Sequence, residues 1–301
     1  MAGPTHGKNP PADELNFGLV TGQHWLSWQE IRAQWEWAEA TGWDSAWTFD
    51  HFLSLYDGDG GPCMEGWTLL AALAALTSKV QLGLMVSSIT HRNPSLLAKE
   101  AVTVDVVSGG RLILGVGAGW SVRDHEAYGW ELPSPGERVD RFGETMEIYR
   151  LLERNERTTF DGTYYTLKDA PFEPKPVFGH IPILVGSRGR RMMGHVARYA
   201  DQWDGGGTPE EYRATGERLN ALCREIGRDP DEIRWVLAAG GDPLESAELF
   251  EEHVRAYAAI GVRSFMFDFP RGEATPAMID IAEQVIPRLR KAFGKPDRGP
   301  R

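Results

Sequence analysis

The chain has 301 residues, 42% of them hydrophobic, and a formal net charge of −11 at pH 7. This composition supplies a sizeable core, and the negative charge argues against nucleic acid or an anionic membrane surface as a partner. No apolar run reaches the roughly 18 residues of a membrane span, the N-terminal residues lack the features of a signal peptide, and the cysteines, Cys63 and Cys223, form no metal-binding spacing. We therefore expect a cytoplasmic protein.

Segments with strand patterns alternate with segments with helix patterns along the whole chain. The predicted strands lie at residues 16–21, 45–49, 80–86, 111–116, 181–185, 201–204, 232–239 and 264–268. The predicted helices lie at residues 28–41, 66–77, 94–107, 138–153, 192–200, 209–225, 245–260 and 276–292. Eight strand–helix units predict one (β/α)8 TIM barrel over residues 15–292, with a flexible leader at 1–14 and a flexible tail at 293–301.

An insertion at residues 154–180 separates the fourth predicted helix from the fifth predicted strand. Two short β patterns, at 158–160 and 164–167, flank Asp161 and Gly162, which predicts a hairpin. A segment rich in proline then leads into the next strand. The insertion is either a wall of the active site or a peripheral decoration.

The segment RLILGVGAGW at residues 111–120 ends in three small residues followed by an indole. A buried strand that ends in bare backbone beside Trp120 suits a flat ring laid against the main chain. The glycines at 115, 117 and 119 have the spacing G-x-G-x-G, whereas the dinucleotide fingerprint requires G-x-G-x-x-G and an immediate helix. The segment therefore favours a barrel strand over a Rossmann motif.

Histidines follow each of the first four predicted strands, namely His24, His51, His91 and His125. Active sites of such barrels lie at the carboxyl ends of the strands, so these side chains could gather at one site or could be polar residues of the rim. A metal site would need three or four ligands. Barrel hydrolases with a metal usually carry His-x-His after the first strand, where this chain has only His24. We predict no metal site.

Asp50 and His51 form the strongest single pair of candidate residues. An acidic side chain beside an imidazole at a strand end could orient the ring or tune its proton affinity. The alternative is an aspartate that caps the next segment beside a surface histidine.

The loop at residues 186–191, with the sequence GSRGRR, is the natural anion site of the chain. Its glycines expose backbone N–H groups, and the helix that follows directs its positive end to the same place. Arg188, Arg190 and Arg191 add three cations that suit phosphate. The alternative is a solvated helix start.

On the opposite face of the barrel, Asp105, Ser108 and the Gly109–Gly110 pair precede Arg111. We interpret these residues as structural. The glycines end the third helix, and we expect an ion pair between Asp105 and Arg111 to fasten the turn to the fourth strand.

Over residues 15–290, the chain resembles the luciferase-like monooxygenase superfamily, and in particular its branch of oxidoreductases that depend on coenzyme F420. The resemblance rests on motifs that occur in the family's order. They are WTFDHF (47–52), EGWTLLAALAALT (65–77), SGGRLILGVGAGW (108–120), PSPGERVDR (133–141), FDGTYYTL (160–167), EPKPV (173–177) and PILVG (182–186).

The resemblance implies a barrel that binds a flavin or deazaflavin at the carboxyl ends of its strands. It places Asp50 close to the ring with His51 beside it, a non-proline cis peptide at Met85–Val86 against the ring, and phosphate contacts at Gly186 and Ser187. The catalytic residues that we predict are Asp50, His51 and Trp120. The cofactor-binding residues that we predict are Asp50, Met85, Val86, Ser88, Gly117, Ala118, Gly119, Gly186, Ser187, Arg188, Gly189 and Arg190.

Two departures from the family pattern bear on the activity. Sugar-phosphate dehydrogenases of the superfamily carry a catalytic glutamate where this chain has Trp120, which argues against that activity. The extra arginines after the fifth strand suit the phosphate and acidic tail of F420 better than the single phosphate of FMN.

The sequence therefore predicts an oxidoreductase that transfers a hydride between F420 and a small organic substrate. The runner-up is an FMN-dependent monooxygenase that is served by a separate flavin reductase. A metal-dependent barrel hydrolase and a barrel that only binds a ligand are further alternatives. The resemblance also implies a homodimer.

Overall fold

The computed structural model of the chain describes residues 14–55, 61–239 and 242–293. The expected leader and tail fall outside these residues, apart from Glu14 and Phe293.

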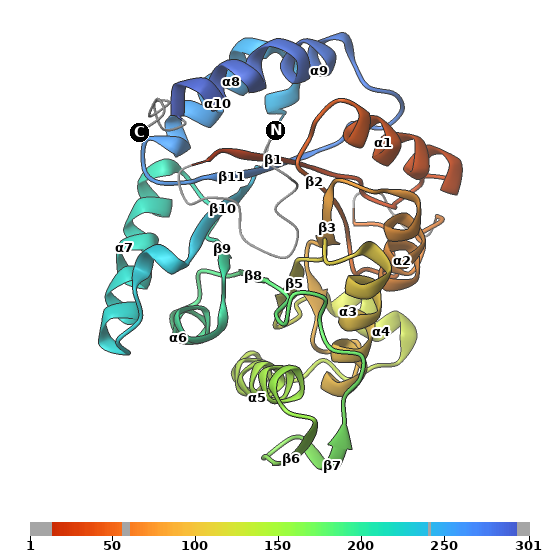
Figure 1. Ribbon diagram of the computed structural model, residues 1–301, viewed down its shortest axis with the longest axis vertical. Helices are drawn as coiled ribbons and strands as arrows, with labels where there is room; N and C mark the ends of the chain where they lie inside the picture. The colour runs from red at the N-terminus through yellow and green to blue at the C-terminus, as the bar shows by residue number, and fades with distance from the viewer. Residues whose placement is uncertain (1–13, 56–60, 240–241, 294–301) are drawn as a thin grey trace, which may run out of the picture.

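The predicted (β/α)8 barrel is confirmed, with its strands in a closed ring and its helices outside it (Figure 1). The parallel sheet has the order β3-β2-β1-β11-β10-β9-β8-β5-β4. A bridge between Leu82 and Leu112, which precedes the strand that starts at Leu114, closes the ring. The barrel strands are β1 (Asn16–Val20), β2 (Ser45–Thr48), β3 (Gln81–Leu84), β4 (Ser87–Ser88), β5 (Leu114–Gly117), β8 (Ile183–Gly186), β9 (Gln202–Asp204), β10 (Arg234–Ala238) and β11 (Ser264–Asp268).

The helices correspond to the predicted ones, most of them with shifted ends, and differ by one additional helix and one interruption. They are α1 (Trp28–Ala40), α2 (Gly66–Leu76), α3 (Pro94–Ser108), α4 (Val122–Tyr128), α5 (Pro135–Arg154), α6 (Arg190–Tyr199), α7 (Pro209–Glu225), α8 (Ala247–Ala258), α9 (Pro276–Asp280) and α10 (Ile286–Phe293). Helix α4 was not predicted, and a π-helical turn at Ile281–Val285 interrupts the last predicted helix. Helix α5 begins earlier than predicted because Ser134 caps it and Pro135 fits its first turn.

The third barrel strand is divided into β3 and β4 by Met85 and Val86, whose shared peptide bond is cis, as the resemblance implied. Close packing of β3 against the next strand requires a glycine. A Cβ atom on Gly115 would lie 2.0 Å from the carbonyl oxygen of Leu84, so no other residue fits there without a backbone shift. The first glycine of the GVGAG run therefore serves strand packing.

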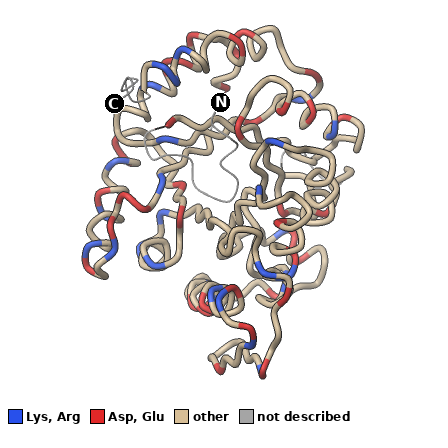
Figure 2. Tube along the Cα trace, viewed as in Figure 1, with Lys and Arg blue, Asp and Glu red and all other residues tan. Residues whose placement is uncertain are grey.

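The core has two parts. Inside the barrel, one buried cluster comes from the strands and from the residue before β5, and it comprises Val20, Trp47, Ile113, Leu184, Val236 and Met266. A larger cluster fills the space between the sheet and the surrounding helices. Charged residues gather on the outer helices and their loops (Figure 2). Together these layers hold the carboxyl ends of the strands as a rigid platform.

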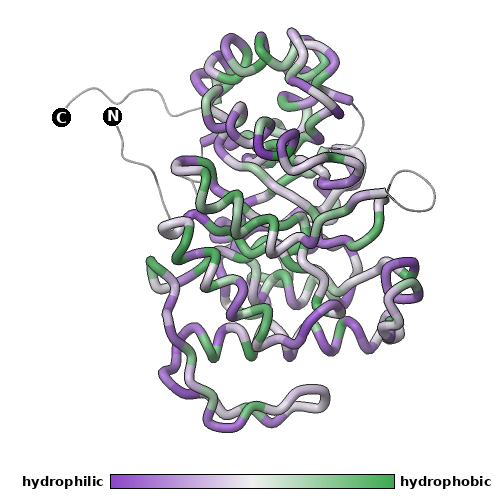
Figure 3. The backbone as a smooth tube through the Cα atoms, turned by 90° about the vertical axis from the view of Figure 1, so that its right-hand side faces the viewer, coloured by the Kyte–Doolittle hydropathy of each residue, from purple (hydrophilic) through white to green (hydrophobic). Residues whose placement is uncertain are grey.

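The insertion between α5 and β8 contains the predicted hairpin, with strands β6 (Arg157–Asp161) and β7 (Thr166–Pro171). The hairpin extends from the body of the barrel (Figure 3). Glu144 of α5 fastens its turn, because the carboxylate accepts hydrogen bonds from the backbone N–H groups of Thr163, Tyr164 and Tyr165. Its residues do not line the cavity described below, which makes it a decoration.

The expected ion pair between Asp105 and Arg111 does not form. The buried guanidinium of Arg111 donates instead to the carbonyl oxygens of Ala74, Thr77, Val80 and Ser108. Carbonyl groups at the end of α2 lack helical partners, and the guanidinium of Arg111 supplies the N–H donors that they need.

A second polar network fastens the start of β8. Nδ1 of His180 lies 3.1 Å from Glu153, and Nε2 lies 3.0 Å from Asp201. Burial disfavours the charged imidazole, but hydrogen bonds to Asp201 and Glu153 outweigh it and raise the pKa of His180 to about 9. A histidine whose pKa is raised on folding stabilises the fold fully below its unfolded pKa of about 6.5, and this contribution is lost as the pH rises through 9.

We therefore expect the free energy of unfolding of the wild type to fall, relative to that of His180→Asn, between about pH 6.5 and pH 9. Urea unfolding of both proteins at several pH values measures the difference. A constant difference across this range would contradict the assignment.

Candidate active site

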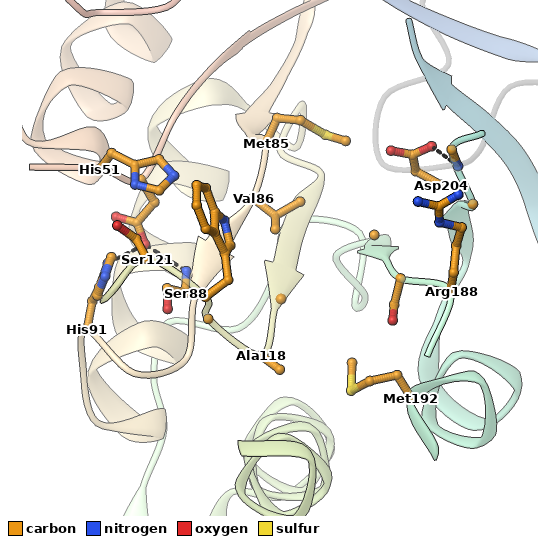
Figure 4. Close-up of a pocket in the computed structure, with 18 residues that line it drawn as sticks. His51, Met85, Val86, Ser88, His91, Ala118, Ser121, Arg188, Met192 and Asp204 are labelled. Atoms are coloured by element: carbon orange, nitrogen blue, oxygen red, sulfur yellow. Dashed lines mark hydrogen bonds and ion pairs between the residues drawn. The ribbon is translucent and has the colours of Figure 1, made fainter. Parts of the chain in front are cut away.

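A cavity of about 450 Å³ opens at the carboxyl ends of β2, β3, β5, β8 and β9 (Figure 4). This size falls within the range of pockets for small molecules and cofactors. The lining residues are Asp50, His51, Met85, Val86, Ser88, His91, Gly117, Ala118, Gly119, Trp120, Ser121, Gly186, Ser187, Arg188, Met192, Asp204, Gly205 and Gly206. The structure thus brings together the predicted site residues except Gly189 and Arg190.

Asp50 is fully buried and is held by groups that follow β3. Its carboxylate accepts a hydrogen bond of 2.8 Å from the backbone N–H of Ser88 and a bidentate pair of 2.6 and 2.9 Å from Arg92. Burial favours the neutral carboxyl, but hydrogen bonds and charge from Arg92 and His91 hold the pKa of Asp50 well below its usual range. Asp50 is therefore an ionised anchor between the loops after β2 and β4.

The partner of His51 is Asp124, not Asp50 as expected. Nδ1 of His51 lies 2.6 Å from Oδ2 of Asp124, and both side chains are buried. Asp124 lies on α4, the short helix that sequence reasoning missed. The Ser-x-x-Asp spacing at 121–124, with Ser121 capping the helix, was the signal that could have revealed it.

Asp124 is ionised. Burial alone would raise the pKa of its carboxyl, but hydrogen bonds from His51 and Ser121 lower the pKa to about 2. The ionised carboxylate makes His51 the member of the pair that carries an exchangeable proton.

The four histidines lie at one end of the barrel in two pairs. The ring centroids of His24 and His51 are 6.5 Å apart, and those of His91 and His125 are 5.2 Å apart. Among the residues that the structure describes, no group of three or more His, Cys, Asp or Glu side chains could hold a metal ion. The described part of the site therefore offers no support for the hydrolase alternative.

A chain of hydrogen bonds runs behind the wall of the cavity. The hydroxyl groups of Ser88 and Thr90 are 2.7 Å apart, and Thr90 lies 2.8 Å from Nε2 of His125. Nδ1 of His125 lies 2.6 Å from the carbonyl oxygen of Ser121 and must donate to it. In the neutral imidazole Nε2 then accepts from Thr90, so Thr90 accepts from Ser88. The oxygen of Ser88 also accepts from the backbone N–H of Thr90 at 3.3 Å, which leaves one lone pair for a donor in the cavity.

The end of β5 forms a wall of bare backbone. A Cβ atom on Gly117 would lie 2.8 Å from Cγ2 of Val86, and Gly119 has a φ of +82°. Trp120 follows and is 65% exposed, and its ring meets that of His51 edge to face at 5.4 Å between centroids. Backbone, Val86 and the indole thus frame a flat space beside His51.

The loop after β8 contributes only part of the predicted cation cluster. Gly186, Ser187 and Arg188 line the cavity. Arg190 is exposed and does not line it, while Arg191 forms an ion pair with Asp140 on α5. Of the three arginines, only Arg188 lines the cavity.

Helix α6 begins next to this loop without a capping side chain, whereas Thr208 caps the following helix, α7. Its first N–H groups remain available to an anion.

Asp204, at the end of β9, is a lining residue that the sequence did not single out. Burial raises the pKa of this carboxyl to about 6, although the N–H of Gly206 donates to it at 3.1 Å. Asp204 and Arg188 lie together on the side of the cavity opposite His51 (Figure 4). The cavity therefore has an imidazole at one side and an arginine with a weakly acidic carboxyl at the other.

The model of the luciferase-like monooxygenase family matches residues 12–293. The chain belongs to this family. An F420-dependent glucose-6-phosphate dehydrogenase of Amycolatopsis mediterranei is 34% identical over 84% of this chain and 92% of its own length. The pyrimidine monooxygenase RutA of Stutzerimonas stutzeri is 31% identical over 70% of this chain and 62% of its own length.

Among solved structures, an F420-dependent secondary alcohol dehydrogenase in complex with an F420-acetone adduct has the same fold. Its TM-score is 0.80 with 20% identity, and the match covers 90% of this chain and 98% of the other. Within the described residues, no helix is long and apolar enough to cross a membrane.

Proposed function

We propose that this family member is an oxidoreductase that transfers a hydride between coenzyme F420 and a small organic substrate. The observation that carries the proposal is the cavity itself, which has His51 beside a flat wall at one side and Arg188 with the uncapped start of α6 at the other. A cofactor with a flat redox ring and an anionic tail would match these two sides of the cavity. The similarity to an F420-dependent dehydrogenase over 92% of its length supports the choice of cofactor.

The residues present fit such a cofactor. Val86 and the backbone of Gly117 to Gly119 would hold the ring, and the oxygen of Ser88 offers an acceptor to a ring N–H group. Arg188 and the first N–H groups of α6 would hold the anionic tail. When bound, the deazaflavin supplies the hydride chemistry.

The chain itself supplies binding, orientation and proton transfer. Oxidation of an alcohol releases a proton from the hydroxyl group as the hydride leaves carbon, and reduction of a carbonyl group requires that proton. His51 is the lining group placed to exchange it, since its ring is held by an ionised carboxylate. Trp120 screens this side of the cavity from water, and Asp50 holds the loop after β4 in place.

The second candidate is an FMN-dependent monooxygenase with a separate flavin reductase. Two observations favour it over the remaining alternatives: a relative is a monooxygenase, and only one of the three predicted arginines lines the cavity. The single phosphate of FMN would need only that one cation.

We also propose a cytoplasmic homodimer. Helix α2 is apolar apart from Thr68, yet Ala72, Ala75 and Leu76 are exposed, and Val107 of the neighbouring α3 is exposed as well. A second copy of the chain would cover this apolar face. Cys63 and Cys223 are both free thiols, which fits a reducing compartment.

Substitutions of Arg188 and of Arg190 distinguish a contact with the cofactor from mere proximity to it. We expect Arg188→Ala to weaken F420 binding about fivefold, because an exposed ion pair contributes roughly 1 kcal/mol. Arg190→Ala should change the affinity less than about twofold, since Arg190 lies outside the cavity.

Fluorescence titration of each purified protein with F420 measures these affinities. Binding of FMN but not of F420 by the wild type would refute the proposed cofactor. Equal losses in both arginine variants would refute the placement of the tail.

A further inference from the structure

We propose that Asp124 is a positioning residue that fixes the tautomer of His51, with the proton on Nδ1, so that Nε2 exchanges the proton with the substrate. The assignment of the tautomer rests on the contacts of Asp124 and on its charge. The role of Nε2 rests in addition on the function proposed above.

The first step is the identity of the donor. Oδ2 of Asp124 lies 2.6 Å from Nδ1 of His51, and the two side chains are only 2% and 10% exposed. An ionised carboxylate has no proton to give, so Nδ1 must donate. Hydrogen bonds keep the pKa of Asp124 at about 2, so the carboxyl is ionised at every pH at which the protein would work.

The second step is that the carboxylate cannot turn. Its other oxygen, Oδ1, accepts hydrogen bonds from the backbone N–H groups of Phe52 and Leu53, at 3.3 and 3.1 Å. These residues follow His51 directly, so Asp124 binds both the ring of His51 and the backbone that follows it. The backbone N–H of Asp124 donates to Oγ of Ser121, the N-cap of α4, at 3.3 Å, which fixes the backbone that carries the carboxylate. The position of Oδ2 opposite Nδ1 is therefore set by several donors.

The third step is the direction of the free nitrogen. With Nδ1 turned to Asp124, Nε2 is the remaining ring nitrogen of a residue that lines the cavity (Figure 4). Trp120 packs edge to face against the same ring, so the imidazole is held on two sides. Trp120 and Asp124 lie in one segment, which therefore supplies both the wall and the orienting carboxylate.

Neutral His51 then presents a lone pair on Nε2. When an alcohol is oxidised, its hydroxyl group would give a proton to Nε2 as the C–O bond becomes a carbonyl group. A bound deazaflavin would take up the hydride that leaves the carbon. The imidazolium that forms lies against the carboxylate of Asp124, which stabilises the new charge. Reduction of a carbonyl group runs through the same atoms in reverse.

The substitution Asp124→Asn separates this role from simple packing. The backbone N–H groups of Phe52 and Leu53 both require an acceptor, so the amide oxygen takes the place of Oδ1. The amide NH₂ group then faces His51, and Nδ1 must accept from it. We expect the proton of the imidazole to move to Nε2, as happens in a serine protease when the aspartate of its triad is replaced by asparagine.

The test uses the whole protein without cofactor, labelled with ¹⁵N in histidine. The ring signals of His51 are identified by their loss in His51→Gln. The wild type is expected to show a protonated Nδ1 and an unprotonated Nε2, and Asp124→Asn the reverse. Asp169→Asn, on the distant hairpin, is the matched control and should leave the His51 signals unchanged.

A wild-type spectrum with the proton on Nε2 would overturn the inference, and this holds even if Asp124→Asn does not fold. An unchanged tautomer in a folded Asp124→Asn protein would overturn it as well. Titration of the same samples with F420 distinguishes the two proposals. A protein that does not bind F420 but carries the proton on Nδ1 refutes the proposed function and supports the positioning role.

Discussion

His51→Gln is expected to lower the rate of hydride transfer by about 10²–10⁴-fold, the range that general acid–base catalysis contributes. The reason is that His51 is the lining imidazole held by an ionised carboxylate, so its loss leaves the substrate proton with water as partner. The affinity for F420 should change by less than about threefold, because the predicted ring contacts come from Val86 and the glycines after β5.

The measurement is a single-turnover rate with F420-loaded protein and any substrate that the wild type converts. His253→Gln, on α8 outside the cavity, is the control and should react at the wild-type rate. A His51→Gln protein as fast as this control would remove His51 from proton transfer. A loss that arises only from weaker F420 binding would make His51 a binding residue.

Arg92→Met should cost about 3–5 kcal/mol of the free energy of unfolding, because it leaves the buried carboxylate of Asp50 without its bidentate partner. The guanidinium is only 5% exposed and also lies 3.0 Å from Glu100. Burial, only partly offset by Arg92, raises the pKa of Glu100 to about 7. Arg92 thus pairs with both Asp50 and Glu100.

Urea unfolding of the protein without cofactor measures this cost. Arg32→Met is a matched control, since Arg32 forms an exposed i,i+4 pair with Glu36 on α1 and should cost no more than about 0.5 kcal/mol. Because folding lowers the pKa of Asp50, this carboxyl stabilises the fold above about pH 4, and its contribution is lost as the pH falls. The loss of stability in Arg92→Met relative to the wild type should therefore shrink in acid. Equal costs for the two substitutions would contradict the anchoring role of Asp50.

The sequence was sufficient to predict the barrel because its strands and helices alternate with clear periods and short connections. Strand 264–268 and helix 209–225 were predicted with the observed bounds. Errors arose where local pattern competes with tertiary contacts. The predicted strand 111–116 starts at Leu114 in the structure, because Arg111 is used to satisfy carbonyl groups at the end of α2.

The candidate site was predictable where it follows strand ends and not where it depends on contacts across loops. Residues directly after β2, β3, β5 and β8 lie at the cavity because parallel strands end at one face. The pairing of His51 with Asp124 spans 73 residues and relies on a helix of seven residues, which is too short for a clear period. Likewise, Arg188 lies in the loop before α6, whereas Arg190 and Arg191 lie in the first turn of the helix, and composition alone could not separate them.

Competition between F420 and FMN for the cavity tests the central claim most directly. Wild-type protein is saturated with F420, and the bound fraction is followed by fluorescence anisotropy as FMN is added. The expected result is that F420 stays bound at a large excess of FMN. Displacement of F420 by an equal concentration of FMN, or no binding of F420 at all, would contradict the assignment of this family member as an F420-dependent oxidoreductase.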